Sequence, residues 1–307
     1  MRRQVDVSVI IPTHDGTAYI GATIDSVLRQ TTLPGEILVV DDCSKDRTVD
    51  LVAGLVGRSR PTVRIIRLEQ NSGGPARPIN VGVEAAAFEL IAVLEQDDHM
   101  APTRVARSAE AAEQFPTAGL ICGRVRLQSP EGETREDLWR DGRRQFDDLS
   151  LSHVTDGLYR AESRDVIASL LRRNIVFTNS NVAFLRDTWR AVGGFDPTYR
   201  LCSDLDFNLK IASRAPYAVV DEVLCDYHER ADSLYHRGLT ATPSTSPAHF
   251  EALLIRLRHA LRTYGLRHEV GREWYRRGWR VLLTDCRHRR WRRCARVLRA
   301  LYPGRPA

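Results

Sequence analysis

The sequence has no long hydrophobic run. No apolar stretch approaches the roughly 18 residues that suggest a membrane-spanning helix, and residues 1–4 lead into a strand-like segment without the apolar core of a signal peptide. We therefore expect a cytoplasmic protein. The apolar fraction of 43% and the charged fraction of 27% are ordinary for a globular chain, and 307 residues are enough for one large domain or for one domain with an appended region.

Cysteine motifs and glycine-rich phosphate loops are missing as well. The six cysteines show no C-x-x-C spacing, which disfavours both a zinc site and a disulfide framework. The turn at residues 12–16 has one glycine where a dinucleotide-binding protein has G-x-G-x-x-G, and there is no P-loop. These absences exclude two common ways of holding a nucleotide.

Lysine is absent from the last part of the chain, where arginine is abundant. From residue 251 onward there are 16 Arg, no Lys and four acidic residues, a local net charge of +12 in a chain whose total is +6. Residues 243–247 read as a linker, and apolar side chains follow at helical spacing. An Arg-rich helix of this kind fits peripheral contact with an anionic membrane through residues 250–305, at the inner face of the plasma membrane. A packed helical subdomain with a solvated arginine face, and binding to nucleic acid without sequence preference, are the alternatives.

Short apolar runs alternate with helical patterns along the first hundred residues. The runs that read as strands are residues 7–11, 36–40, 63–68 and 90–94. Such alternation implies parallel pairing with right-handed crossovers, hence an α/β domain. Acidic residues follow the second and fourth runs, at the strand ends where ligands bind. Acidic residues at this edge are suited to a ligand whose phosphate groups are bound through a metal ion.

The first 235 residues contain a series of short blocks: residues 7–13 (VSVIIPT), 26–31 (SVLRQT), 36–46 (EILVVDDCSKD), 71–77 (NSGGPAR), 80–82 (NVG), 95–98 (EQDD), 192–196 (VGGFD) and 203–207 (SDLDF). In order and spacing, these blocks resemble a family 2 glycosyltransferase of the GT-A fold. The resemblance implies a Rossmann-like sandwich around a mostly parallel sheet. It implies a catalytic domain at 1–240, with a nucleotide-binding half at about 1–125 and an acceptor-binding half at 126–240, followed by a basic helical region at 241–307.

The resemblance places Glu95 and Asp97 where the family's Asp-x-Asp motif binds a divalent metal. A hard cation on oxygen ligands neutralises the diphosphate leaving group as the glycosidic bond breaks, so Mn²⁺ or Mg²⁺ is the expected cofactor. Asp97 is the predicted metal ligand, and Asp98 belongs to the predicted metal set as its supporting neighbour. Glu95 replaces the usual first Asp and is longer by a methylene, and together with Asp97 it is expected to contact the nucleotide sugar. His228 is a further metal candidate, because residues 227–233 resemble the family's closing Tyr-Arg-x-His-x-x-Ser segment with the basic residues exchanged. The alternative for the acidic residues at 95–98 is a structural role, in which they cap the start of the following helix.

The nucleotide-binding residues are also carried over from the resemblance. Asp42 is expected to bind the nucleobase, although a carboxylate after a strand also caps a helix, here one that begins near Asp46. Arg77 is the expected partner of a base carbonyl or a phosphate. The opposite wall of the predicted nucleotide site is formed by Pro12, Thr13 and His14.

Direct displacement at the anomeric carbon needs a base for the proton of the acceptor hydroxyl. The resemblance places Asp204 in this role, although Ser203 stands where the family has Glu. Asp206, two residues along, is the runner-up, and helix capping is the alternative for both. In the polar stretch 128–163, Trp139 is a candidate for stacking on the acceptor sugar, with a solvated loop as the alternative.

The sequence thus predicts an inverting, metal-dependent transferase. It would transfer a sugar from a nucleotide sugar to an acceptor hydroxyl. The resemblance implies a UDP-sugar, because uridine is the common nucleotide in the family. The acceptor would be a glycan or a lipid-linked one, in cell-envelope polysaccharide, glycolipid or teichoic-acid-type synthesis. A catalytically silent GT-A domain that serves as a binding or scaffolding subunit is the alternative. It is motivated by three departures from the family's pattern: Glu95 for the first Asp of the metal motif, Pro78 where Asn is usual, and Ser203 for Glu.

Overall fold

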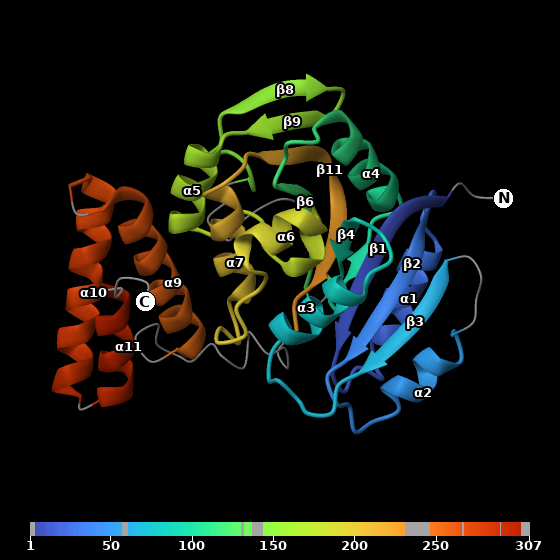
Figure 1. Ribbon diagram of the computed structural model, residues 1–307, viewed down its shortest axis with the longest axis horizontal. Helices are drawn as coiled ribbons and strands as arrows, with labels where there is room; N and C mark the ends of the chain where they lie inside the picture. Colours follow the sequence, from blue (N-terminus) through green and yellow to red (C-terminus); the bar gives the residue numbers. More distant parts are fainter. Residues whose placement is uncertain are drawn as a thin grey trace. The chain divides into compact units, whose positions relative to one another are not determined.

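The structure is a computed structural model (Figure 1). It describes residues 4–56, 61–129, 132–136, 144–230, 246–265, 267–288 and 290–301. The chain divides into two compact units, Met1–Ser233 and Leu234–Ala307.

Within the described residues, the first unit is built on one sheet of eleven strands. Their order is β3-β2-β1-β4-β10-β6-β11-β9-β8, with β5 beside β11 and β7 beside β6. The strands are β1 (Gln4–Thr13), β2 (Leu33–Asp41), β3 (Thr62–Arg67), β4 (Leu90–Val93), β5 (His99–Met100), β6 (Leu120–Gln128), β7 (Thr134–Glu136), β8 (Leu151–Thr155), β9 (Leu158–Ala161), β10 (Ala183–Leu185) and β11 (Tyr217–His228).

The four strands predicted from apolar runs are confirmed as β1, β2, β3 and β4, and they pair in parallel. Nearly every side chain of β2 and β4 is buried, as are residues 7–13 of β1, which explains why the runs are continuous instead of alternating. Helices α1 (Ile20–Leu28), α2 (Thr48–Ala53) and α3 (Ala76–Ala85) connect them. Parallel strands need such crossovers, so the carboxyl ends of β1, β2 and β4 meet at one edge.

Antiparallel β10 joins the two halves of this sheet. It pairs with β4 on one side, with Ala183 opposite Ala92, and with β6 on the other, with Ala183 opposite Ile121. The remaining helices of the first unit are α4 (Arg104–Gln114), α5 (Ser163–Arg172), the 3₁₀ helix η1 (Asn179–Asn181), α6 (Arg186–Val192) and α7 (Ser203–Ala212). Because β10 lies next to β4, the residues just before β10 reach the edge where β4 ends.

The second unit is helical. Its described helices α9 (Pro247–Tyr264), α10 (Glu269–Arg287) and α11 (Trp291–Leu301) pack against one another (Figure 1). Buried apolar residues form its interior, and the buried carboxylate of Asp285 pairs with Arg290 (3.3 Å) and Arg293 (3.1 Å). The predicted helical character of the carboxyl region is confirmed. None of the described helices combines the length and apolarity needed to cross a membrane.

Candidate active site

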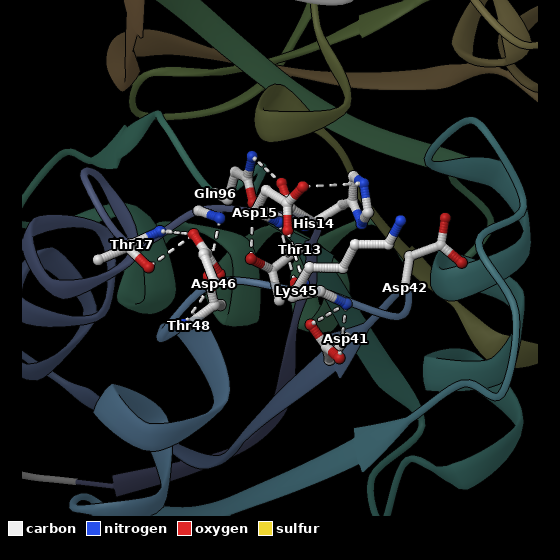
Figure 2. Close-up of polar contacts among 12 residues, drawn as sticks. Thr13, His14, Asp15, Thr17, Asp41, Asp42, Lys45, Asp46, Thr48 and Gln96 are labelled. Carbon is white, nitrogen blue, oxygen red and sulfur yellow. Dashed lines mark hydrogen bonds and ion pairs between the residues drawn. The ribbon is translucent and has the colours of Figure 1, made fainter.

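The loops that follow β1 and β4 are joined through one amide side chain. Gln96 Oε1 accepts hydrogen bonds from Thr13 Oγ1 (2.6 Å) and from the His14 backbone N–H (2.9 Å), and Gln96 Nε2 donates to the His14 carbonyl (3.1 Å; Figure 2). Gln96, the middle residue of the Glu-Gln-Asp motif, is therefore part of the wall predicted to hold a nucleotide. Pro12 and Thr13 in this wall are buried, and His14 is partly exposed.

Asp42 lies at the end of β2 and is only 3% exposed. Its carboxylate accepts hydrogen bonds from the Ser72 N–H (3.0 Å to each oxygen) and from Ser72 Oγ (2.9 Å). At the start of α2 it is Asp46 that accepts a bond from the Thr48 N–H, at 3.0 Å (Figure 2). Asp42 thus orders the turn at 71–75, and its binding to a nucleobase stays a prediction. Arg77, in the first turn of α3, is exposed.

The carboxylates after β4 have three different environments. Asp98 is 1% exposed, and its oxygens accept hydrogen bonds from the His228 N–H (3.0 Å) and Thr178 Oγ1 (3.4 Å). Glu95 accepts bonds from Asn179 Nδ2 (3.0 Å) and Thr178 Oγ1 (3.3 Å). The side chain of Asp97 is 24% exposed and lies 3.5 Å from Arg230 Nε. Of the three acids, Asp98 is buried, and Glu95 and Asp97 are partly exposed.

Burial and mutual repulsion affect the protonation of this acidic cluster, Glu95, Asp97 and Asp98. Burial raises the pKa of Glu95 to about 7, and the charges of Asp97 and Asp204 act in the same direction. Burial also raises the pKa of Asp98, again helped by the charges of Asp97 and Glu95. Full ionisation of all three acids is therefore disfavoured.

Asp204 lies in the first turn of α7. Asn174 Nδ2 donates a hydrogen bond to Asp204 Oδ2 (2.5 Å), and the charge of Asp204 reaches Glu95, whose pKa it raises. Asp206, in the same turn, is 0% exposed and pairs with Lys210 Nζ (2.7 Å). The structure therefore brings Asp204 to the acidic cluster and turns Asp206 into the interior. The assignment of Asp204 as a base stays a prediction.

The segment at residues 174–181, before β10, was not found from the sequence. Asn174 holds Asp204, Thr178 and Asn179 hold Glu95, and Ser180 Oγ accepts a hydrogen bond from the Glu95 N–H (2.9 Å). The signal in the sequence is weak, a run of amide and hydroxyl residues (TNSN) that matches no catalytic motif. These residues reach the site because β10 pairs antiparallel with β4, which places the segment before β10 at the end of β4.

His228 lies at the end of β11, with its ring centroid 4.3 Å from that of His99. Burial lowers the pKa of His228, and the neighbouring His99 and Arg230 lower it further. The imidazole is therefore neutral near pH 7, as a metal ligand must be. Its Nδ1 atom is buried and has no hydrogen-bond partner within the described residues. Trp139, the predicted acceptor-binding residue, lies outside the described residues.

The donor set fits a hard divalent cation. Among the described residues no group of three metal-ligating side chains is brought together. Mg²⁺ in nucleotide sites, however, is usually held by one or two carboxylates together with phosphate oxygens and water. Asp97 supplies an accessible carboxylate, and the repulsion among the three acids is what a cation would relieve. Asp98 faces the protein interior, so its part in metal binding stays a prediction, as does that of His228.

The raised pKa of Glu95 leads to a prediction on stability. Because the folded protein holds this proton more tightly than the unfolded chain, the contribution to stability is complete below about pH 4.5 and is lost as the pH rises through about 7. Glu95→Gln removes the ionisation. In EDTA we expect the variant to have a free energy of unfolding about 1–3 kcal/mol higher than the wild type at about pH 8, and an equal one near pH 4. Urea unfolding across this range measures the difference, and a difference independent of pH would contradict the prediction.

The sequence profile of "Glycosyl transferase family 2" matches residues 8–171. The succinoglycan biosynthesis protein ExoO of Rhizobium meliloti (strain 1021) is 39% identical over 108 residues, 35% of this chain and 30% of that protein. The poly(ribitol-phosphate) beta-N-acetylglucosaminyltransferase TarS of Staphylococcus aureus (strain Mu50 / ATCC 700699) is 36% identical over 95 residues, 30% of this chain and 16% of that one. The chain thus spans less than a third of the length of either relative.

The crystal structure of S. aureus TarS 1–349 in complex with UDP-GlcNAc has a TM-score of 0.62 and 18% identity, and the similarity covers 97% of this chain and 73% of that chain. This similarity shows the fold and confirms the predicted GT-A arrangement around a mostly parallel sheet. The profile match covers more than half of the sequence and includes residues 8–13 of β1, all of β2 and the acidic cluster. The chain belongs to glycosyl transferase family 2.

Proposed function

We propose that this chain is an inverting, metal-dependent glycosyltransferase that moves a sugar from a UDP-sugar to an acceptor hydroxyl. The observation that carries the proposal is the meeting of Asp204 with the acidic cluster. Asp204 lies in α7 and the cluster follows β4, and the segment at residues 174–179 holds both, because Asn174 binds Asp204 while Thr178 and Asn179 bind Glu95. A base beside a cation-binding carboxylate is what direct displacement from a nucleotide diphosphate requires.

In the proposed reaction the acceptor oxygen forms a bond to the anomeric carbon while the bond from that carbon to the diphosphate oxygen breaks. Asp204 takes the hydroxyl proton, and Asn174 holds the Asp204 carboxylate through its hydrogen bond of 2.5 Å. Asp42, Arg77 and the wall at Pro12, Thr13 and His14 bind the nucleotide. A Mn²⁺ or Mg²⁺ ion held at Asp97, with His228 as a further ligand, would neutralise charge on the diphosphate. One displacement inverts the anomeric configuration.

The relatives support a role in assembling envelope glycans. ExoO is named for succinoglycan biosynthesis, TarS for transfer of N-acetylglucosamine to poly(ribitol phosphate), and a TarS structure contains UDP-GlcNAc. For this chain we infer an acceptor in cell-envelope polysaccharide, glycolipid or teichoic-acid-type synthesis, with a glycan or a lipid-linked molecule as the substrate.

The test is a panel of nucleotide sugars with UDP, GDP and dTDP as the nucleotide, each incubated with the protein and Mn²⁺. We expect one UDP-sugar to raise the melting temperature and to be slowly hydrolysed, because a ligand that binds only the folded state raises its apparent stability. If a UDP-sugar binds but none is hydrolysed or transferred, the result would favour a catalytically silent binding domain over an active transferase. Stabilisation by GDP-sugars alone would contradict the choice of uridine.

We also propose that the second unit contacts an anionic membrane, which would place the catalytic domain at the inner face of the plasma membrane. The exposed face of α10 carries arginines at helical spacing, with Leu283, 55% exposed, on the same side of the helix. These arginines are Arg272, Arg276, Arg280 and Arg287. In the described part of the unit, Glu251 and Asp285 are buried, whereas Glu269 and Glu273 are exposed on α10 and offset part of this charge.

Replacing these four arginines by Gln is expected to weaken binding to vesicles that contain phosphatidylglycerol by about 100-fold or more, because each arginine near an anionic surface contributes about 1 kcal/mol. Co-sedimentation measures the loss. The control is a variant with four exposed arginines of the first unit, Arg29, Arg164, Arg172 and Arg190, replaced by Gln. Equal loss in both variants would point to total charge instead of this face. Duplex DNA binding with a steep salt dependence, without vesicle binding, would favour the nucleic-acid alternative.

A further inference from the structure

Arg230 follows β11 and points into the edge of the sheet where the acidic cluster lies. Its Nη2 donates a hydrogen bond to the Asp97 carbonyl (3.2 Å), and its Nε lies 3.5 Å from Asp97 Oδ2. The guanidinium carbon also lies 3.4 Å from the centroid of the Tyr19 ring, in the turn before α1. The side chain is 20% exposed. Arg230 is therefore held in place over Asp97 by a charge, a carbonyl group and an aromatic face.

The carboxylate that Arg230 contacts is the same one that is predicted to bind a divalent cation. The side chain of Asp97 is partly exposed, so an incoming cation and the guanidinium converge on one small group. A divalent cation bound to Asp97 would lie close to the positively charged guanidinium of Arg230, and the two would repel each other. This repulsion is stronger in a partly buried site than in water. A cation at Asp97 and Arg230 in its present position therefore weaken each other's binding.

The guanidinium of Arg230 has hydrogen-bonding capacity left over. It carries five N–H donors, and within the described residues its Nε is buried without a hydrogen-bond acceptor. A diphosphate offers several anionic oxygens that match a guanidinium in geometry and charge. A diphosphate would therefore offer Arg230 more anionic hydrogen-bond acceptors than its present contacts do.

We propose that Arg230 is a stand-in cation, which occupies Asp97 in the free protein and moves onto the diphosphate when nucleotide and metal bind. This inference rests on the proposed function, because it takes Asp97 as the metal ligand. It has a thermodynamic consequence: metal alone binds weakly, since it must displace Arg230, whereas metal and nucleotide diphosphate strengthen each other's binding by the same factor. Arg230 thereby prevents the site from filling with metal before the donor arrives.

The experiment is a titration of the full chain with Mn²⁺, followed through the electron paramagnetic resonance of the free ion, without UDP and with saturating UDP. Arg230→Gln is expected to bind Mn²⁺ alone about tenfold more tightly than the wild type and to bind UDP less tightly in Mn²⁺. The factor by which UDP strengthens Mn²⁺ binding should then fall by about tenfold, while the part that comes from phosphate oxygens binding the metal remains. Arg230→Lys keeps a positive charge near Asp97, so its Mn²⁺ affinity without UDP should stay within about twofold of the wild type.

Two controls separate the possible causes. Arg190→Gln, on the exposed surface of α6, should leave both affinities unchanged. In the background of Asp97→Asn, Arg230→Gln should no longer change Mn²⁺ binding, because the shared carboxylate is gone. Unchanged or weaker Mn²⁺ binding in Arg230→Gln would overturn the stand-in role and leave the proposed function standing. If Asp97→Asn binds Mn²⁺ with UDP as the wild type does, the metal site itself is wrong, and both proposals fall.

Discussion

Asp204→Asn is expected to lower kcat for sugar transfer by about 10²–10⁴-fold, while the nucleotide sugar binds with unchanged affinity. The amide cannot take a proton from the acceptor hydroxyl, and a positioned general base contributes a rate factor of this size. Asn retains an oxygen in place of Asp204 Oδ2, which now accepts a hydrogen bond from Asn174 Nδ2. Release of UDP in the presence of acceptor measures kcat, and calorimetric titration with the nucleotide sugar measures binding.

The matched control for this prediction is Asp206→Asn, two residues further along α7. Asp206 is buried and paired with Lys210, so its replacement is expected to cost about 1–3 kcal/mol of unfolding free energy. Turnover per folded molecule should nevertheless stay close to that of the wild type. The opposite outcome, with Asp206→Asn inactive when folded and Asp204→Asn active, would make Asp206 the base.

Asp97→Asn is expected to weaken UDP binding in the presence of Mn²⁺ by about 100-fold, whereas binding in EDTA changes little. The reason is that a neutral amide oxygen is a poorer ligand for a hard cation than a carboxylate, and the cation is expected to carry much of the diphosphate affinity. The shift in melting temperature on adding UDP, with Mn²⁺ and with EDTA, measures the effect. Equal transfer activity of the wild type in EDTA would contradict the metal role.

Asp98→Asn is the control that distinguishes the two neighbouring acids. Burial raises the pKa of Asp98, so its carboxyl already tends to hold a proton, and Asn can still accept the hydrogen bond from the His228 N–H. We expect the Mn²⁺-dependent affinity for UDP to change by no more than a few-fold. A loss in Asp98→Asn as large as that in Asp97→Asn would instead show that Asp98 also binds the metal.

The buried strands and the edge that carries the acids followed from the sequence. Apolar runs at β1, β2 and β4 are long enough to be recognised without context, because strands buried on both faces need an apolar residue at nearly every position. Parallel pairing then places the residues after each strand at one edge, which is why Asp42 and Asp97 were expected near each other. The resemblance of the sequence blocks to a glycosyltransferase family then suggested a functional role for each of these acidic residues.

The contacts of each acid were decided only by the tertiary structure. Periodicity does not show that Asp98 turns inward, that Asp42 holds Ser72, or that Arg230 lies over Asp97, because each of these bonds joins residues far apart in the chain. The segment with Asn174, Thr178 and Asn179 reaches the site because β10 inserts, antiparallel, between β4 and β6. The sequence by itself determined which strands are buried and which acids lie at their ends, because burial acts on each run locally. Which of the acids is buried was decided by long-range pairing.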